Sequence, residues 1–188
     1  MTEKLYLTSP MPPSVNHYTA IRAITKNGKP MAMLYETSEA KKYKKDFSKY
    51  VTEEIIKQDW SLPVNKTQHF YIDCTYYFDR IDKDPNNYFK CMLDAITETQ
   101  CIWADDNVVC ERVNRIYYDV KDPRIEMVIY PVEYIGIFDN QEELNSFEKR
   151  CSTCKRCNKN CSIHKKAIEG RIQDEITNGV CSKYKEAI

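Results

Sequence analysis

The clearest pattern in the chain is a strict alternation of apolar and polar positions between Phe70 and Phe78. Phe, Ile, Cys, Tyr and Phe occupy every second place, and the residues between them include Asp73 and Thr75. A period of two is that of a strand with one buried face. The segment therefore predicts a β-strand.

Other strands are predicted less sharply. Apolar positions recur in three further segments, and we expect strands at residues 5–7, 108–118 and 125–130. Prolines between residues 10 and 13 end the first of them. Residues 19–35 have no clean period, but Asn27-Gly28 marks the tip of a hairpin or loop.

A first helix is predicted after Thr37 or Ser38, either of which is a favoured cap. Lysines cover its polar face, and it should end near Trp60 to Pro63. Its apolar positions recur at helical spacing: Ala40, Tyr43, Phe47, Tyr50, Val51 and Ile55.

A second helix is predicted with Asp84 as its N-cap and Pro85 in its first position. One apolar stripe follows, which includes Met92, Ala95 and Ile96. A short third helix is expected at Gln141–Lys149.

The order of these elements predicts an α/β (α+β) fold, with a small mixed sheet of about four strands and two helices on one face. At 188 residues the chain fits one domain with a small appendage. We expect the main domain at residues 1–135 and a small helical, cysteine-rich tail at residues 136–188.

Composition narrows the class of protein. Charged residues make up 30% of the chain and hydrophobic residues 42%, with a formal net charge of zero, so net charge gives no argument for nucleic acid. There is no apolar run of membrane-spanning length and no hydrophobic segment behind Met1 of the signal-peptide type. The sequence therefore predicts a cytoplasmic protein without a membrane partner.

Candidate chemistry lies in two polar segments, Asp84-Pro85-Asn86-Asn87 with Lys90, and Asp105-Asp106. Mg²⁺ prefers oxygen ligands and keeps several waters, so a few Asp and Asn oxygens are enough. A nearby lysine can stabilise the charge that develops at a phosphate during cleavage. Each residue alone reads as a helix cap or a solvated charge, but together they predict a divalent-metal phosphodiester site.

These segments resemble those of a known family, the RusA-type Holliday junction resolvases, which are homodimeric endodeoxyribonucleases common in prophages. The resemblance covers roughly residues 5–131. It rests on Pro12-Pro13-Ser14-x-Asn16, on Asp84-x-Asn86-Asn87-x-x-Lys90 followed by Leu93-Asp94-Ala95-Ile96, and on Asp105-Asp106.

The resemblance implies a RusA-like fold, Mg²⁺ (or Mn²⁺) as cofactor, branched DNA as substrate and a role in recombination and repair. It implies that Asp84 and Asp106 are metal ligands, that Lys90 is the essential lysine and that Asn87 supports the helix turn. Asn86 stands where the family usually has a second aspartate. Its amide oxygen can still ligate Mg²⁺, but it brings no charge and no general base.

Two neighbouring carboxylates, Asp82 and Asp105, are candidates to compensate for this departure. For DNA contacts we name Asn16 and, from the lysine run at 41–49, Lys41 and Lys45, although such a run is more often a solvated helix face.

Five of the nine cysteines lie in the last 38 residues. In a reducing compartment such a cluster favours metal binding over disulfides. We predict a structural zinc at Cys154, Cys157, Cys161 and Cys181, with Cys151 or His164 as alternative ligands. The spacing of the first four cysteines also fits an iron–sulfur cluster, and unliganded thiols remain a third possibility.

The leading interpretation is a metal-dependent, structure-selective endonuclease that resolves four-way junctions by paired nicks from a two-fold dimer. The alternative is a catalytically weak or inactive DNA-binding or regulatory module with a zinc site. A third interpretation is a redox sensor that uses the thiols.

Overall fold

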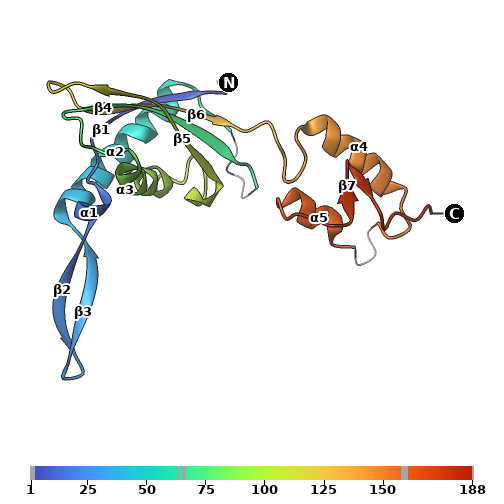
Figure 1. Ribbon diagram of the computed structural model, residues 1–188, viewed down its shortest axis with the longest axis horizontal. Coiled ribbons are helices and arrows are strands. Elements are labelled where there is room, and N and C mark those ends of the chain that lie inside the picture. The colour runs from blue at the N-terminus through green and yellow to red at the C-terminus, as the bar shows by residue number, and fades with distance from the viewer. Residues whose placement is uncertain (1–2, 63, 65–66, 158–160, 188) are drawn as a thin grey trace. The chain divides into compact units, whose positions relative to one another are not determined.

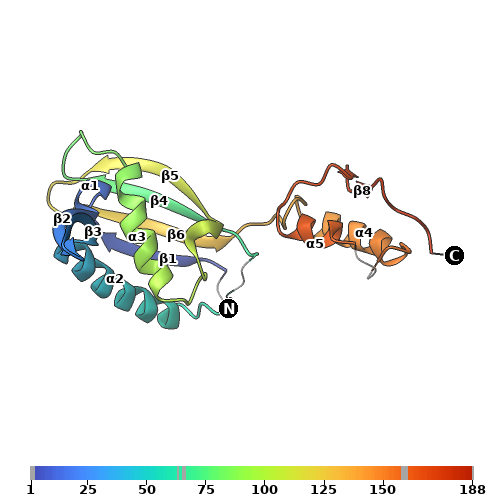
Figure 2. The ribbon, with the colours of Figure 1, turned by 90° about the horizontal axis from the view of Figure 1, so that it is seen from below.

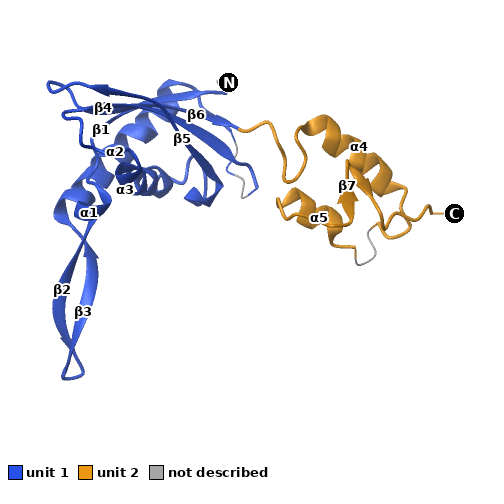
Figure 3. Cartoon of the chain, in the orientation of Figure 1, with its two compact units in different colours: residues 1–131 blue, residues 132–188 orange. Residues whose placement is uncertain are grey.

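The computed structural model describes residues 3–62, 64, 67–157 and 161–187. The chain forms two compact units, residues 1–131 and residues 132–188 (Figure 3). The first unit ends at Pro131, whereas the sequence analysis expected the boundary after residue 135.

The first unit holds most of the secondary structure. In chain order it contains β1 (Leu5–Pro10), α1 (Val15–Tyr18), β2 (Thr19–Lys26), β3 (Lys29–Glu36), α2 (Ser38–Lys57), β4 (Phe70–Phe78), α3 (Asn86–Glu98), the 3-10 helix η1 (Asp106–Val108), β5 (Val109–Tyr118) and β6 (Arg124–Pro131).

Its main sheet has four strands in the order β1-β6-β4-β5. Strand β6 is antiparallel to both β1 and β4, whereas β4 and β5 are parallel and are connected through α3. Helices α2 and α3 lie on one face of this sheet (Figures 1 and 2). The mixed sheet with two helices on one face confirms the predicted fold class.

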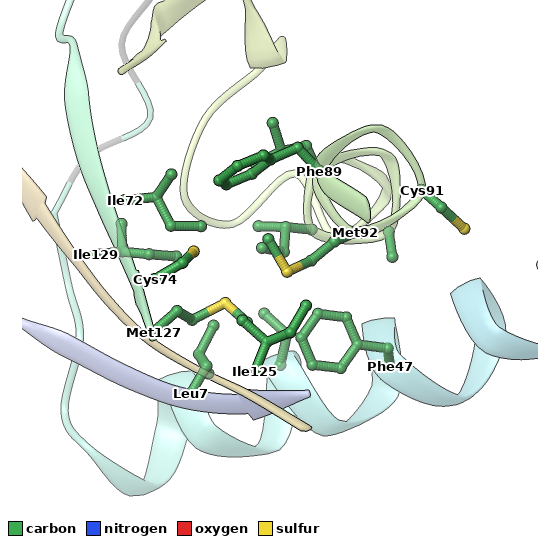
Figure 4. Packing of buried hydrophobic residues seen from close by; sticks show 14 of the residues in the cluster. Leu7, Phe47, Ile72, Cys74, Phe89, Cys91, Met92, Ile125, Met127 and Ile129 are labelled. Carbon is green, nitrogen blue, oxygen red and sulfur yellow. The ribbon is translucent and has the colours of Figure 1, made fainter. Parts of the chain in front are cut away.

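The core lies between the sheet and these two helices. Along β4 every second residue is buried, as its alternation predicts. Figure 4 shows Ile72 and Met127 of the sheet facing Phe47 of α2 and Met92 of α3. Burial of apolar surface on this scale is the main stabilising contribution to such a domain.

Helix boundaries differ from the predictions by a few residues. Thr37 caps α2 as predicted, because its Oγ1 accepts the N–H of Ala40 at 3.2 Å. Helix α2 ends at Lys57, before the predicted Trp60. Helix α3 begins at Asn86 with Pro85 in the cap position, one residue later than predicted.

Strands β2 and β3 form a separate two-stranded ribbon. Asn27 and Gly28 form its tip with positive φ values of 52° and 73°, which confirms the predicted turn. Both strands lack a regular burial pattern, since most of their residues are exposed. Figure 1 shows the ribbon extending away from the main sheet and its helices.

The second unit contains α4 (Gln141–Ser152), α5 (Ile163–Ile168) and the short strands β7 (Ile176–Thr177) and β8 (Val180–Cys181). Among the described residues of this unit, the buried core cluster is small, with four members: Phe138, Leu144, Phe147 and Ala167. Asn140 caps α4, because its Oδ1 accepts the N–H of Glu143. The Glu143 carboxylate in turn accepts the N–H of Asp139, the residue before the cap.

Among the described residues, no helix has the length and apolar character needed to cross a membrane.

Candidate metal and DNA site

Lys90 links two carboxylates, one of which, Asp106, was predicted for the site. It lies on α3, and its Nζ is 2.7 Å from Asp94 Oδ1 and 3.5 Å from Asp106 Oδ2. The hydrogen bond that Lys90 donates to Asp94 raises the pKa of Lys90 and outweighs the opposing effect of desolvation. The Lys90 ammonium is therefore held in its charged form beside the Asp106 carboxylate.

Asp84 and Asn86 lie at the start of the same helix. Asp84 Oδ1 accepts the backbone N–H of Asn86 at 3.0 Å, and both side chains are exposed. Asn86 precedes Lys90 by four residues, so the two lie on one face of α3. The helix start thus adds carboxylate and amide oxygens to the end of α3 that bears Lys90.

The two members of the acidic pair have different roles. Asp105 Oδ1 accepts the N–H of Asn107 at 3.1 Å and caps η1, whereas Asp106 faces Lys90. Asp82, the other candidate to compensate for Asn86, pairs with Arg80 at 2.9 Å. Asp82 and Asp105 are therefore both engaged in local contacts.

Glu111 on β5 is a nearby carboxylate that the sequence analysis did not single out. Desolvation raises the pKa of Glu111, the charge on Asp106 raises it further, and Lys90 lowers it. These interactions place Glu111 within electrostatic range of both residues. Its only sequence signal is its position on the strand that follows Asp106, which was read as a structural strand alone.

The donor set fits Mg²⁺, a cation that takes oxygen ligands and retains waters. In the part of the chain that the structure describes, no three His, Cys, Asp or Glu side chains are grouped closely enough to ligate one ion. Two carboxylates, Asp84 and Asp106, would therefore act with the Asn86 amide and water.

The hydroxyl of Tyr76 is buried and lacks a hydrogen-bond partner among the described residues. Burial raises the pKa of Tyr76 most, and the charges of Glu111 and Asp84 raise it further.

The comparison with known families bears on this site directly. The family model described as endodeoxyribonuclease RusA matches residues 10–130, which is more than half of the chain and includes Asp84, Lys90 and Asp106. The chain belongs to the RusA endodeoxyribonuclease family. No curated protein matches it.

In this RusA-family unit, Asp94 belongs to the Leu93-Asp94-Ala95-Ile96 motif, and the structure gives its side chain a specific position. It accepts hydrogen bonds from Lys90 and from the Tyr18 hydroxyl, at 2.7 and 2.5 Å. Tyr18 also donates to Glu36 at 2.9 Å, which in turn pairs with Lys44 at 2.7 Å. A continuous polar network therefore connects Lys90 to the base of the β2–β3 ribbon.

The residues predicted to contact DNA are exposed. Asn16 lies on α1, and Lys41 and Lys45 lie on α2. Lys44, from the same lysine run, differs because it is buried and pairs with Glu36 and Glu98, at 2.7 and 2.5 Å. Lys44 is thus a structural residue, because two carboxylates compensate the cost of burying its charge.

The five cysteines of the second unit lie outside the RusA match and line one cavity of about 450 Å³. They are Cys151, Cys154, Cys157, Cys161 and Cys181, and His164 lines the cavity with them. His164 Nε2 is 2.9 Å from Glu148 Oε1. Among the described residues, no three of these side chains are grouped closely enough to ligate one ion, and the zinc ligand set stays a prediction.

The Cys154 sulfur lies among backbone N–H groups. The backbone N–H of Lys185 donates to its Sγ at 3.4 Å. That bond, with smaller effects from the N–H groups of Arg156 and Cys157, lowers the pKa of Cys154. Hydrogen bonds of this kind favour the thiolate, which is the metal-binding form of cysteine.

Proposed function

We propose that the RusA-family unit is a metal-dependent, structure-selective endonuclease that cleaves four-way DNA junctions. The observation that supports this most strongly is the position of Lys90 between Asp94 and Asp106, beside Asp84 and Asn86 at the start of α3. The Lys90 side chain is exposed and lies within 3.5 Å of two carboxylates, so its ammonium is accessible to a phosphate.

Each residue has a distinct part in the proposed mechanism. Asp84, Asn86 and Asp106 hold the divalent cation through oxygen atoms. Lys90, kept protonated by Asp94, binds the scissile phosphate and stabilises the negative charge that develops on it. When bound, Mg²⁺ or Mn²⁺ supplies charge stabilisation and activates water for attack on phosphorus. No protein nucleophile is required.

A four-way junction has two-fold symmetry, and so does a homodimer. We propose that two copies of this chain place two sites against strands of like polarity and produce paired nicks. Recognition then depends on branched shape and on backbone contacts, to which Asn16, Lys41 and Lys45 contribute.

The site assignment is tested by Asp84→Asn and Asp106→Asn, which remove one negative ligand each and keep the side-chain shape. We expect both variants to lose cleavage of a synthetic junction and to bind it as the wild type does, in a gel-shift assay without divalent metal. Asp105→Asn is the matched control, because Asp105 caps η1, whereas Asp106 is the member of the pair that lies beside Lys90. Full cleavage by either test variant would refute the assignment.

The alternative proposal is a DNA-binding or regulatory module with weak or no catalysis, and Asn86 is the observation that favours it. The same assay separates the two proposals. Junction binding without any nicking by the wild type, in Mg²⁺ or Mn²⁺, would establish the alternative.

For the second unit we propose a structural zinc bound by Cys154, Cys157, Cys161 and Cys181. The shared cavity and the small core support this, because a unit whose described core cluster has only four buried members gains stability from a metal. Binding requires the cysteine side chains to rotate toward one point. An iron–sulfur cluster is the alternative, since it would hold the sulfur atoms further apart than a single ion does.

Elemental analysis of protein purified without oxygen tests this proposal. We expect about one zinc per chain, lost in Cys154→Ser and retained in Cys101→Ser, a control outside the cavity. Iron with acid-labile sulfide would assign the cluster instead, and an absence of metal would leave the thiols unliganded.

A further inference from the structure

The β2–β3 ribbon has two chemically different faces. Residues that pair across the two strands share a face, and residues alternate between faces along each strand. The register pairs Arg22 with Met33, Ile24 with Met31 and Lys26 with Lys29. These three pairs therefore lie on one face, together with Tyr35, which pairs with Ala20.

All the cations of the ribbon are on that face, which we call the basic face: Arg22, Lys26 and Lys29. Arg22 lies over the Tyr35 ring, 5.3 Å from its centroid, and its Nη2 is 3.8 Å from the Met33 sulfur. The opposite face begins at the base with the pair Thr19 and Glu36. From that pair to the loop at the tip, it has no charged residue. The only acid of the two strands, Glu36, is paired at the ribbon base with Lys44.

The ribbon exposes several large apolar side chains. Ile21 and Leu34 are 71% and 62% exposed, and Met31, Met33 and Tyr35 are also exposed. A two-stranded ribbon without further packing is at best marginally stable in water. An exposed apolar surface that is flanked by charge is typical of an interaction site.

The base of the ribbon is attached to the helix that carries Lys90. Tyr18, immediately before β2, donates to Asp94 of α3 and to Glu36 at the end of β3. The N–H of Thr37 also bonds the Tyr18 carbonyl at 3.1 Å and closes the base of the ribbon. A partner bound along the ribbon would therefore extend from the proposed site of cleavage.

We propose that the β2–β3 ribbon is a DNA-binding arm whose basic face contacts the phosphate backbone of a duplex arm of the junction. The inference rests on the proposed function, which it extends from the scissile phosphate to the flanking duplex. Charge complementarity selects DNA as the occupant, because three cations without an opposing acid attract phosphates. A second copy of the same face would instead bring like charges together.

The arm also fits the geometry of nucleic acid. Two-stranded ribbons enter DNA grooves in several known binding modes. Apolar side chains such as Met31 and Met33 can lie against sugars or unstacked bases, between the cations that hold the backbone.

The test is a triple variant, Arg22→Gln with Lys26→Gln and Lys29→Gln, in the full chain. Binding to a synthetic four-way junction is measured without divalent metal over a series of salt concentrations. Each phosphate contact contributes about 0.9 to the slope of log affinity against log salt, so we expect the slope to fall by roughly 2 to 3. At low salt the affinity should fall by at least about tenfold.

The matched control keeps the charges and changes the side chains: Arg22→Lys with Lys26→Arg and Lys29→Arg. We expect it to retain the wild-type slope. An unchanged slope in the glutamine variant, with unfolding temperature and circular dichroism like those of the wild type, would overturn the proposal. A change in sedimentation with an unchanged slope would assign the ribbon to self-association instead, and would equally overturn it.

Failure of this inference is distinguishable from failure of the proposed function, because binding is measured without metal and cleavage by the wild type is measured separately. A wild type that cleaves junctions, with a glutamine variant that binds them equally well, would leave the nuclease proposal intact and refute the arm.

Discussion

Asn86 is the residue at which this chain departs from the acidic pattern of the family it belongs to. It is exposed at the start of α3, beside Asp84 and on the face that bears Lys90. An amide supplies a neutral oxygen to a cation, so the proposed metal site would have one negative charge fewer than a site with a third carboxylate. The consequence should be weaker metal binding within an otherwise intact arrangement.

We predict that Asn86→Asp binds Mg²⁺ more tightly and needs less of it for half-maximal cleavage. The added carboxylate also meets a favourable helix N-terminus, so the fold should tolerate it. The measurement is a Mg²⁺ titration of junction cleavage for both proteins. An unchanged Mg²⁺ requirement would mean that position 86 points away from the cation and that Asp82 or Glu111 is the better candidate ligand.

Lys44 and Asp94 show which side-chain roles the sequence did not reveal. Lys44 lies in a run of lysines that reads as a solvated face, and only the tertiary structure brings Glu36 and Glu98 to it. Asp94 is four residues after Lys90, a spacing that predicts an ion pair, but its bond to Tyr18 joins residues 76 apart in sequence. Contacts of that range follow from the fold and not from local pattern.

At the scale of the elements, the buried pair Lys44–Glu36 joins α2 to the end of β3. Lys44→Met should destabilise the first unit by about 1–2 kcal/mol. This is less than the ~3–5 kcal/mol lost when one partner of a fully buried ion pair is removed, because Glu36 and Glu98 are partly exposed. Lys42→Met is the control: Lys42 pairs with Asp46 on the surface, and we expect no measurable change. Urea unfolding measures both.

The effect of Lys44→Met should depend on pH in a defined direction. The hydrogen bond from Lys44 lowers the pKa of Glu36 in the folded protein. A lowered pKa contributes stability above the unfolded value, about 4.3, and that stability is lost as pH falls through the folded value. The difference between wild type and variant should therefore be largest near neutral pH and shrink below about pH 4.

Gly136, in the connection before α4, tests the packing of the second unit. It has a φ of +60°, and a Cβ there would lie 2.0 Å from the Ala167 carbonyl oxygen. Gly136→Ala should therefore destabilise this unit by more than the ~1–2 kcal/mol of an unfavourable φ alone.

Gly28 at the ribbon tip is the matched control for Gly136→Ala. Its φ is +73°, but no atom lies within 4 Å of the position of an added Cβ. Gly28→Ala should carry only the conformational cost. Equal losses of unfolding temperature for the two variants would contradict the close packing of Gly136 against α5 (Ile163–Ile168).

The sequence predicted those elements whose burial is periodic. Apolar residues alternate along strand β4 and recur at helical spacing along helix α2, because one face of each element packs against the core. Strands β2 and β3 were not predicted as strands, because most of their residues are exposed and no burial pattern results. The strand order β1-β6-β4-β5 depends on long-range pairing, which local periodicity does not encode.

For the whole molecule, the sequence identified the residues of the candidate site but not the contacts that surround them. Asp84, Asn86, Lys90 and Asp106 were identified from spacing and from the family resemblance, and the structure places Lys90 against Asp106. Glu111 was missed because it has no motif and reaches this region only through the pairing of β5 with β4. The roles of all these residues depend on whether the protein cleaves DNA.

The most direct test is nick mapping on a synthetic four-way junction, with each strand labelled in turn, in Mg²⁺. We predict nicks on two opposing strands at symmetric positions, which require the divalent metal and are absent from a linear duplex of the same sequence. Junction binding without metal-dependent nicking, or equal cleavage of the duplex, would contradict a structure-selective nuclease.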